Sequence, residues 1–141
     1  SLGEIFIPNS VTNIGADVFY GCKNLNKINI SNKVVILEKG VFGGCENLNE
    51  ITIPYGMINI GDGAFEECKS LREVSIPDNV ASIGDYAFWN CQSLNQITVW
   101  SNVTSIGYSA FDGCKNLTIR AFKGSYVKRY ALENEIPFEE I

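Results

Sequence analysis

The sequence predicts an α/β repeat solenoid, a right-handed coil in which each 23-residue unit supplies one short parallel strand and one short α- or 3₁₀-helical turn. Three observations predict this fold. Phenylalanine, cysteine and leucine each recur five times at an interval of 23 residues, the columns around them are apolar, and the composition is that of a globular chain, with 45% hydrophobic and 19% charged residues. The invariant columns are Phe19, Phe42, Phe65, Phe88 and Phe111; Cys22, Cys45, Cys68, Cys91 and Cys114; and Leu25, Leu48, Leu71, Leu94 and Leu117.

The repeated unit reads I-x-I-P-x-x-V-x-x-I-G-x-x-A-F-x-x-C-x-x-L-x-x and is clearest from Val74 to Gln96, where valine takes the place of the first isoleucine. A residue type that recurs at a fixed interval occupies the same place in every coil. Stacked coils therefore turn each apolar column into a continuous buried ladder, with neighbouring strands about 4.8 Å apart.

The segment before the conserved proline predicts the strand of each unit. Val74-Ser75-Ile76 alternates apolar and polar residues, as a strand with one buried face does. Pro77 follows directly, and proline has no amide hydrogen to donate to a strand ladder. Pro8 and Pro54 occupy the same place in their units, so we expect each strand to end there.

The segment after the conserved glycine predicts the helical turn. Ala87, Phe88 and Cys91 have the spacing of one helical face, which favours one or two turns of α- or 3₁₀-helix on the side opposite the strand.

The end of the chain departs from the repeat and predicts a cap. We expect a solenoid of about five units over residues 1–121, and a helix and strand covering the last coil over residues 122–141. Ser125 is the predicted N-cap of a helix over residues 126–134, and residues 136–138 are expected to be extended.

The start of the chain has no equivalent cap. Residues 2–8 already lie in the middle of a unit, so we expect a fragment from which the preceding coils are missing. The apolar cross-section of the first coil, with Ile5, Ile7, Val11 and Ile14, then predicts end-to-end self-association of this form of the chain.

Charge and composition exclude several classes of function. A net charge of −5 and a pI near 4.7 oppose the phosphate backbone, so no nucleic acid is expected as a partner. No apolar run approaches the roughly 18 residues of a membrane span, so no membrane insertion is expected. The absence of histidine excludes His-based catalytic triads and His-zinc sites. We expect no cofactor and no metal.

The cysteine column is interpreted as core. Five cysteines cannot all pair within one chain, and stacked Cβ atoms near 4.8 Å are farther apart than the roughly 3.8 Å that a disulfide prefers. Free cysteine packs as a small hydrophobic residue, which predicts a buried ladder of thiols.

Two further columns resemble sites of chemistry. Glycine recurs in one turn column, with Glu38 in the second unit, but no phosphate-binding G-x-x-x-x-G-K-[ST] motif is present. Glu50 and Glu73 share a strand column, so in-register stacking would place their backbones about 5 Å apart. Lys27 and Arg72 lie nearby, and we interpret the carboxylates as part of a solvated charged face. No catalytic set is therefore predicted.

The repeated pattern resembles the BspA-like leucine-rich repeats over residues 2–121, and residues 124–141 resemble the closing segment of that family. The resemblance implies a leucine-rich-repeat fold in a secreted or surface-attached protein of a host-associated bacterium or, less often, a parasitic protist. It also implies adhesion to host matrix proteins or to other cells, and it supplies no catalytic residue.

Aromatic residues that depart from their columns are the candidate binding residues. Trp100 stands where three other units have proline. Trp89 and Tyr86 occupy variable columns: the other units have Tyr20, Gly43, Glu66 and Asp112 in the first, and Asp17, Gly40, Gly63 and Ser109 in the second. Tyr86, Trp89 and Tyr108 are expected to form one patch on the helical side, and Trp100 and Phe122 to mark the C-terminal end of the strand face. Exposed aromatic residues are enriched at binding hot spots.

The strand face is expected to be small and polar, and able to dock an extended protein or a glycan. Its predicted residues are Phe6, Asn29, Thr52, Ser75 and Thr98, flanked by Glu4, Lys27, Glu50, Glu73 and Gln96.

The preferred hypothesis is thus a non-enzymatic module that binds a protein or glycan on host or neighbouring cells, at an extracellular or cell-surface location. The alternative is a passive spacer that presents another domain.

Overall fold

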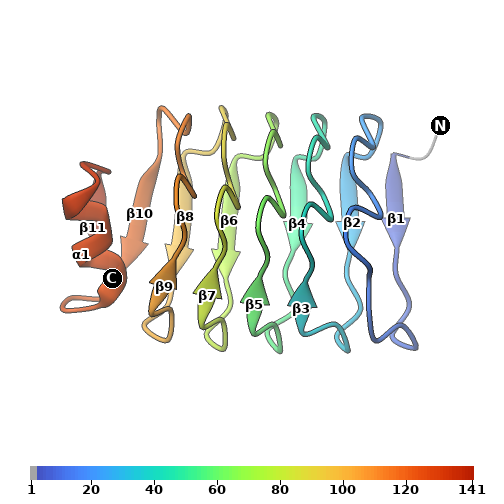
Figure 1. Ribbon diagram of the computed structural model, residues 1–141, viewed down its shortest axis with the longest axis horizontal. Helices are drawn as coiled ribbons and strands as arrows, with labels where there is room; N and C mark the ends of the chain where they lie inside the picture. Colours follow the sequence, from blue (N-terminus) through green and yellow to red (C-terminus); the bar gives the residue numbers. More distant parts are fainter. Residues whose placement is uncertain (1–2) are drawn as a thin grey trace.

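The computed structural model describes residues 3–141 and shows a solenoid of parallel strands (Figure 1). The first row of strands, here called the strand row, forms two parallel sheets and advances by one repeat at each pairing, so that Ile28 lies opposite Ile51. The predicted solenoid with one such strand per unit is confirmed. The row contains β1 (Glu4–Phe6), β2 (Lys27–Asn29), β4 (Glu50–Thr52), β6 (Glu73–Ile76), β8 (Gln96–Val99) and β10 (Thr118–Ala121).

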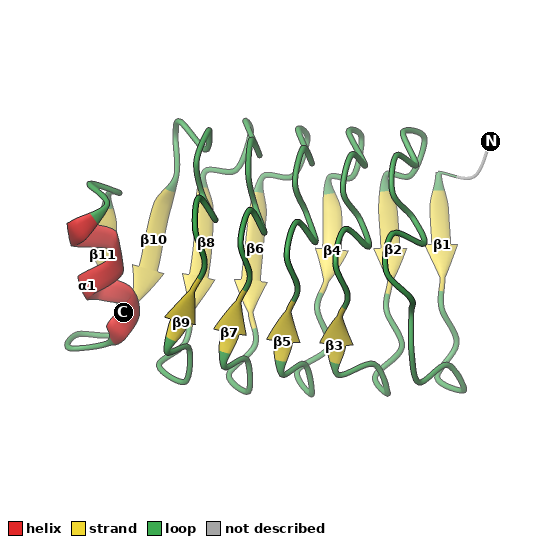
Figure 2. Ribbon diagram, in the orientation of Figure 1, coloured by secondary structure: helices red, strands yellow, loops and turns green. Residues whose placement is uncertain are grey.

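A second row of two-residue strands, in front of the first in Figure 2, lies on the other side of each coil. It contains β3 (Ile36–Leu37), β5 (Asn59–Ile60), β7 (Ser82–Ile83) and β9 (Ser105–Ile106), all parallel. The sequence did not predict this row, because two residues are too few for an alternating pattern to be recognised.

The turns that follow the second row are not helical, and the predicted α- or 3₁₀-helix in each unit is wrong. Backbone N–H groups donate alternately within a coil and to the next coil: Trp89 N–H donates to Tyr86 O at 3.0 Å, and Phe88 N–H donates to Ala110 O at 2.8 Å. A helix cannot propagate here because Tyr86 and Asn90 have left-handed φ angles of 56° and 58°. The helical spacing identified the buried residues correctly but not the backbone that carries them.

Phenylalanine side chains form a stack through the middle of the solenoid. Phe42, Phe65 and Phe88 are fully buried, and neighbouring ring centroids lie 5.6 Å (Phe42 to Phe65) and 5.2 Å (Phe65 to Phe88) apart with nearly parallel planes. The predicted core column is therefore confirmed as a continuous ladder.

The cysteines are free thiols, as expected, and the three inner ones are buried. They also have a role that the sequence did not reveal. The thiol of Cys68 donates to Phe42 O of the preceding coil at 3.2 Å, and that of Cys91 donates to Phe65 O at 3.1 Å. The same carbonyls accept a backbone N–H within their own coil, so the thiol uses the second lone pair of each oxygen.

The C-terminal cap covers the ends of both strand rows. Helix α1 (Tyr126–Glu133) begins at the predicted N-cap, where the Ser125 hydroxyl accepts the Lys128 N–H at 3.1 Å, and it ends one residue earlier than predicted. The Tyr126 hydroxyl accepts the N–H of Ile106 in β9 at 3.2 Å. Strand β11 (Phe138–Glu140) pairs in parallel with β10.

The glycine column depends on how closely the coils approach each other. A Cβ added at Gly84 would lie 2.6 Å from the backbone nitrogen of Asp62 in the preceding coil. Glu38 occupies the same column, but the second row starts at β3, and within residues 3–141 no strand of the preceding coil pairs with it. A side chain is accepted at Glu38 because the first coil is not hydrogen-bonded there.

Within residues 3–141, no helix combines the length and apolarity needed to cross a membrane.

Candidate functional site

Tyr86, Trp89 and Tyr108 lie together, and we call them the aromatic patch. The Tyr86 ring centroid lies 6.4 Å from that of Trp89 and 5.7 Å from that of Tyr108, both in edge-to-face arrangements. Their exposed fractions are 41% for Tyr86, 37% for Trp89 and 71% for Tyr108. The structure thus brings together the three residues that the sequence placed on the side opposite the strand row.

Tyr86 has a backbone conformation that favours glycine. Its φ of 56° matches those of Gly40 (62°) and Gly63 (60°), which occupy the same column in earlier units. A left-handed conformation costs a non-glycine residue about 1–2 kcal/mol. The centre of the aromatic patch is therefore a tyrosine at a position where glycine would be accommodated with less strain.

Trp100 and Phe122 form a separate pair. Their ring centroids are 5.1 Å apart at an angle of 46°, and both side chains are partly buried. Trp100 directly follows β8 and Phe122 directly follows β10, so the pair lies at the C-terminal ends of neighbouring strands. They present less surface than Tyr108, because each ring covers part of the other.

Sequence reasoning did not select two other exposed aromatic residues, Tyr55 at 81% and Tyr20 at 54% exposure, whereas Phe6, at 72% exposure, belongs to the predicted strand face. Tyr20 packs over Gly43, where an added Cβ would lie 2.7 Å from the ring. Tyr55 could have been noticed, because it directly follows Pro54 in a turn.

The strand face carries ion pairs between neighbouring strands. Lys27 and Glu50 lie 3.5 Å apart, and Arg120 and Glu139 lie 3.6 Å apart. Glu73 does not stand beside Glu50 in a ladder, because β4 and β6 belong to separate sheets. The in-register pairing that would bring Glu50 and Glu73 together is thus absent. Glu50 is paired with Lys27 instead.

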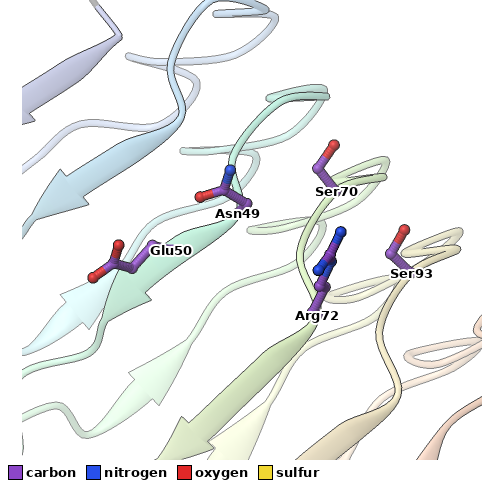
Figure 3. Close-up of a pocket in the computed structure, with 5 residues that line it drawn as sticks. All are labelled: Asn49, Glu50, Ser70, Arg72 and Ser93. Carbon is purple, nitrogen blue, oxygen red and sulfur yellow. The ribbon is translucent and has the colours of Figure 1, made fainter.

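A hollow of about 470 Å³, which we call the polar slot, opens where β4 and β6 are unpaired (Figure 3). It is lined by Asn49, Glu50, Ser70, Arg72 and Ser93. The sequence did not predict it. The available signal was a change of residue type, since Ser70 and Ser93 replace the asparagine that other units have in this column.

In the described part of the chain, no group of three or more cysteine or carboxylate side chains gathers as a metal site would require.

Known proteins share this repeat and this fold. The family described as BspA type leucine rich repeat region matches residues 1–118 in six copies, which agrees with the six strands of the strand row. No curated protein matches the chain.

Three solved structures illustrate the similarity. A leucine-rich-repeat protein of Bacteroides ovatus is 32% identical, with a TM-score of 0.80, over 99% of this chain and 42% of its own. A leucine-rich cell-surface protein of Faecalibacterium prausnitzii is 31% identical, with a TM-score of 0.84, over 92% of this chain and 34% of its own. A leucine-rich-repeat protein of T. pallidum is 28% identical, with a TM-score of 0.80, over 84% of this chain and 58% of its own.

The chain thus spans between 34% and 58% of the length of these solved proteins. The family match over residues 1–118 includes β1 to β9, the phenylalanine and cysteine ladders and the turns described above. The chain belongs to the BspA-type leucine-rich-repeat family.

Proposed function

We propose that the chain is a non-enzymatic interaction module of a secreted or cell-surface protein, and that its aromatic patch binds a protein or glycan on a host or neighbouring cell. One observation carries the proposal: Tyr86 holds a left-handed backbone and exposes its ring between Trp89 and Tyr108.

The fold does not require this tyrosine. Gly40 and Gly63 fill the same position in two other coils, and Asp17 and Ser109 fill it in two more, all with left-handed φ angles; glycine adopts this conformation without a Cβ clash. The whole column shares this left-handed backbone, so what distinguishes Tyr86 from its equivalents is its exposed aromatic ring. Tyrosine, a rigid aromatic group with a polar hydroxyl, is also among the side chains enriched at binding hot spots.

The proposed location rests on the family and on a relative. The F. prausnitzii protein is described as a cell-surface protein, and it shares both the repeat and the fold with this chain. Adhesion is the function we propose for such a surface. The Trp100 and Phe122 pair is proposed as a secondary contact, because its rings are less exposed.

The test is a set of single substitutions in the aromatic patch, assayed by pull-down against extracellular matrix proteins and on a glycan array. We expect Tyr86→Gly and Tyr108→Ala to abolish binding, with Trp89→Ala as a third variant. Tyr86→Gly is the sharpest of these, because it removes the ring while relieving backbone strain, and the protein should remain folded.

The matched control is Tyr55→Ala, which removes a more exposed aromatic residue outside the patch. Equal loss of binding in Tyr55→Ala and Tyr86→Gly would contradict a site at the patch. Uniform absence of binding by the unmodified chain would reject the interaction module and favour the passive spacer.

A further inference from the structure

The strand row is interrupted between the third and fourth coils, although the other side of the solenoid is continuous. β4 and β6 share no strand pairing, whereas β5 and β7 of the same two coils pair Asn59 with Ser82 and Ile60 with Ile83. The two coils are therefore separated on the side of the strand row only, and they remain paired on the side of the second row. Ile51 in β4 is only half-buried at this place, whereas Ile97 in β8 is fully buried.

In the described part of the chain, one backbone hydrogen bond between neighbouring coils is absent where the strand row is interrupted. Asn49 N–H donates to Asn26 O at 3.1 Å and Asn95 N–H donates to Arg72 O at 2.9 Å, each linking neighbouring coils. Among residues 3–141, the equivalent bond from Arg72 N–H to Asn49 O is absent. The Asn49 carbonyl therefore accepts no backbone hydrogen bond from Arg72, and Asn49 lines the slot.

The side chains beside the hollow differ from those at the equivalent place in the second coil. In the second coil, Asn47 extends its amide to Lys23 O of the preceding coil at 2.6 Å and closes the gap between them. Ser70 and Ser93 hold the same position in the next two coils, and a serine side chain is too short to make this bridge. Neither Ser70 nor Ser93 makes such a bridge to a described residue, and both line the polar slot.

The residues that line the slot are polar. Of its two charged side chains, Glu50 makes an ion pair and Arg72 makes none with a described residue. The Glu50 carboxylate is paired with Lys27 at 3.5 Å, and Figure 3 shows it directed away from Arg72. Arg72 lies between Ser70 and Ser93 in the same view, and it makes no ion pair with any described residue. The slot therefore offers an uncompensated guanidinium together with hydroxyl and amide groups.

We propose that the polar slot binds a carboxylate-bearing sugar of an acidic glycan, with Arg72 holding the carboxylate. A guanidinium binds a carboxylate through two parallel hydrogen bonds. The serine hydroxyls and the Asn49 amide supply donors and acceptors for sugar hydroxyls. The volume of about 470 Å³ suits a small ligand, and all five lining residues are polar or charged.

The experiment is a titration of the isotopically labelled chain, followed by amide NMR, with D-glucuronate and with D-glucose as the neutral sugar of the same shape. We expect shifts at Ser70, Arg72 and Ser93 with glucuronate, and weaker binding of glucose. Arg72→Gln should weaken glucuronate binding about tenfold or more, the scale of one lost charge-assisted hydrogen bond.

Two variants control for unfolding and for general charge effects. Ser70→Asn with Ser93→Asn fills the slot with the residue that the repeat itself uses, so it should abolish binding without loss of stability. Arg120→Gln removes an arginine that is already paired with Glu139, so glucuronate binding should be unchanged.

The proposal is independent of the aromatic patch, so Tyr86→Gly should bind glucuronate as the unmodified chain does. Equal affinity for glucose and glucuronate would overturn it, as would unchanged binding in Arg72→Gln. Shifts caused by an N-acetylated glutamate peptide, with none from glucuronate, would identify an acidic peptide as the ligand and reject the glycan.

Discussion

At the scale of single residues, the backbone of the neighbouring coil decides which side chains are allowed. Gly84 and Gly15 occupy the same column, but their surroundings differ. A Cβ at Gly84 would meet the backbone of Asp62 at 2.6 Å, whereas a Cβ at Gly15 would meet only the end of Val18 at 3.4 Å.

This difference predicts the effect of alanine in the glycine column. We expect Gly84→Ala to lower the free energy of unfolding by about 1–3 kcal/mol, as overpacking against a backbone does, because that coil cannot move without breaking its own hydrogen bonds. Gly15→Ala should lower the free energy of unfolding by only a few tenths of the amount expected for Gly84→Ala. Urea denaturation of both variants measures the difference, and equal effects would show that coil contact is not the cause.

The buried thiols predict a loss of stability in alkaline solution. Burial raises the pKa of Cys45 from 9.0 to about 12. Above pH 9 the unfolded chain therefore loses a proton that the folded chain keeps, so stability falls as pH rises from 9 toward 12. The free energy of unfolding should decrease between pH 8 and pH 10.

The control for this pH dependence is Cys45→Ser, which retains a donor to the carbonyl but does not titrate in this range. The decrease in stability should be smaller in this variant. An identical decrease in Cys45→Ser would assign the effect to other groups, such as Tyr130, whose pKa burial also raises to about 12.

At the scale of elements, hydrogen bonds between coils, rather than local helix propensity, decide the backbone conformation of the turns. The segment that carries Ala87 and Phe88 has helical spacing, yet its N–H groups alternate between partners in two coils. By contrast, α1 is the one helix in residues 3–141, and its N-cap, its buried Val127 and its buried Ala131 follow the local rules that predicted it.

Helix α1 also caps β9 at the end of the second row, through the hydroxyl of Tyr126. Tyr126→Phe leaves the N–H of Ile106 without its acceptor, so we expect a loss of about 1 kcal/mol in the free energy of unfolding. Tyr108→Phe is the control, because its hydroxyl makes no hydrogen bond to any described residue. Thermal or urea denaturation distinguishes the two, and equal stability of both variants would contradict the capping role.

At the scale of the whole molecule, the two ends of the stack differ. The last coil is covered: the Tyr130 ring lies 6.2 Å from that of Phe111 and ends the phenylalanine stack, and β11 covers β10. The first described coil leaves Val18 at 55% exposure, beside a hollow of about 330 Å³ lined by Phe6, Val11 and Phe19 among others.

This asymmetry predicts end-to-end self-association of the 141-residue chain through its first coil. Light scattering should show an apparent mass that rises with concentration, and Val18→Lys should suppress the rise because it places a charge in the apolar face. Leu132→Lys, at a residue with 62% exposure on α1, should leave association unchanged. A constant monomer mass at high concentration would reject the prediction.

The sequence alone determined the register of the coils, the buried columns and the N-cap of the C-terminal helix. Phe88, Cys91 and Leu94 recur at one interval, and stacking places such residues at the same depth whatever their backbone conformation. The aromatic candidates were also identifiable, because Tyr86 and Trp89 depart from their columns.

Only the tertiary structure decided the second row, the non-helical turns and the polar slot. A two-residue strand such as Ser82–Ile83 and the opening beside Ser70 depend on how closely one backbone approaches the next coil. That distance is set jointly by the residues of two neighbouring units, and it is not encoded in the pattern of either unit alone.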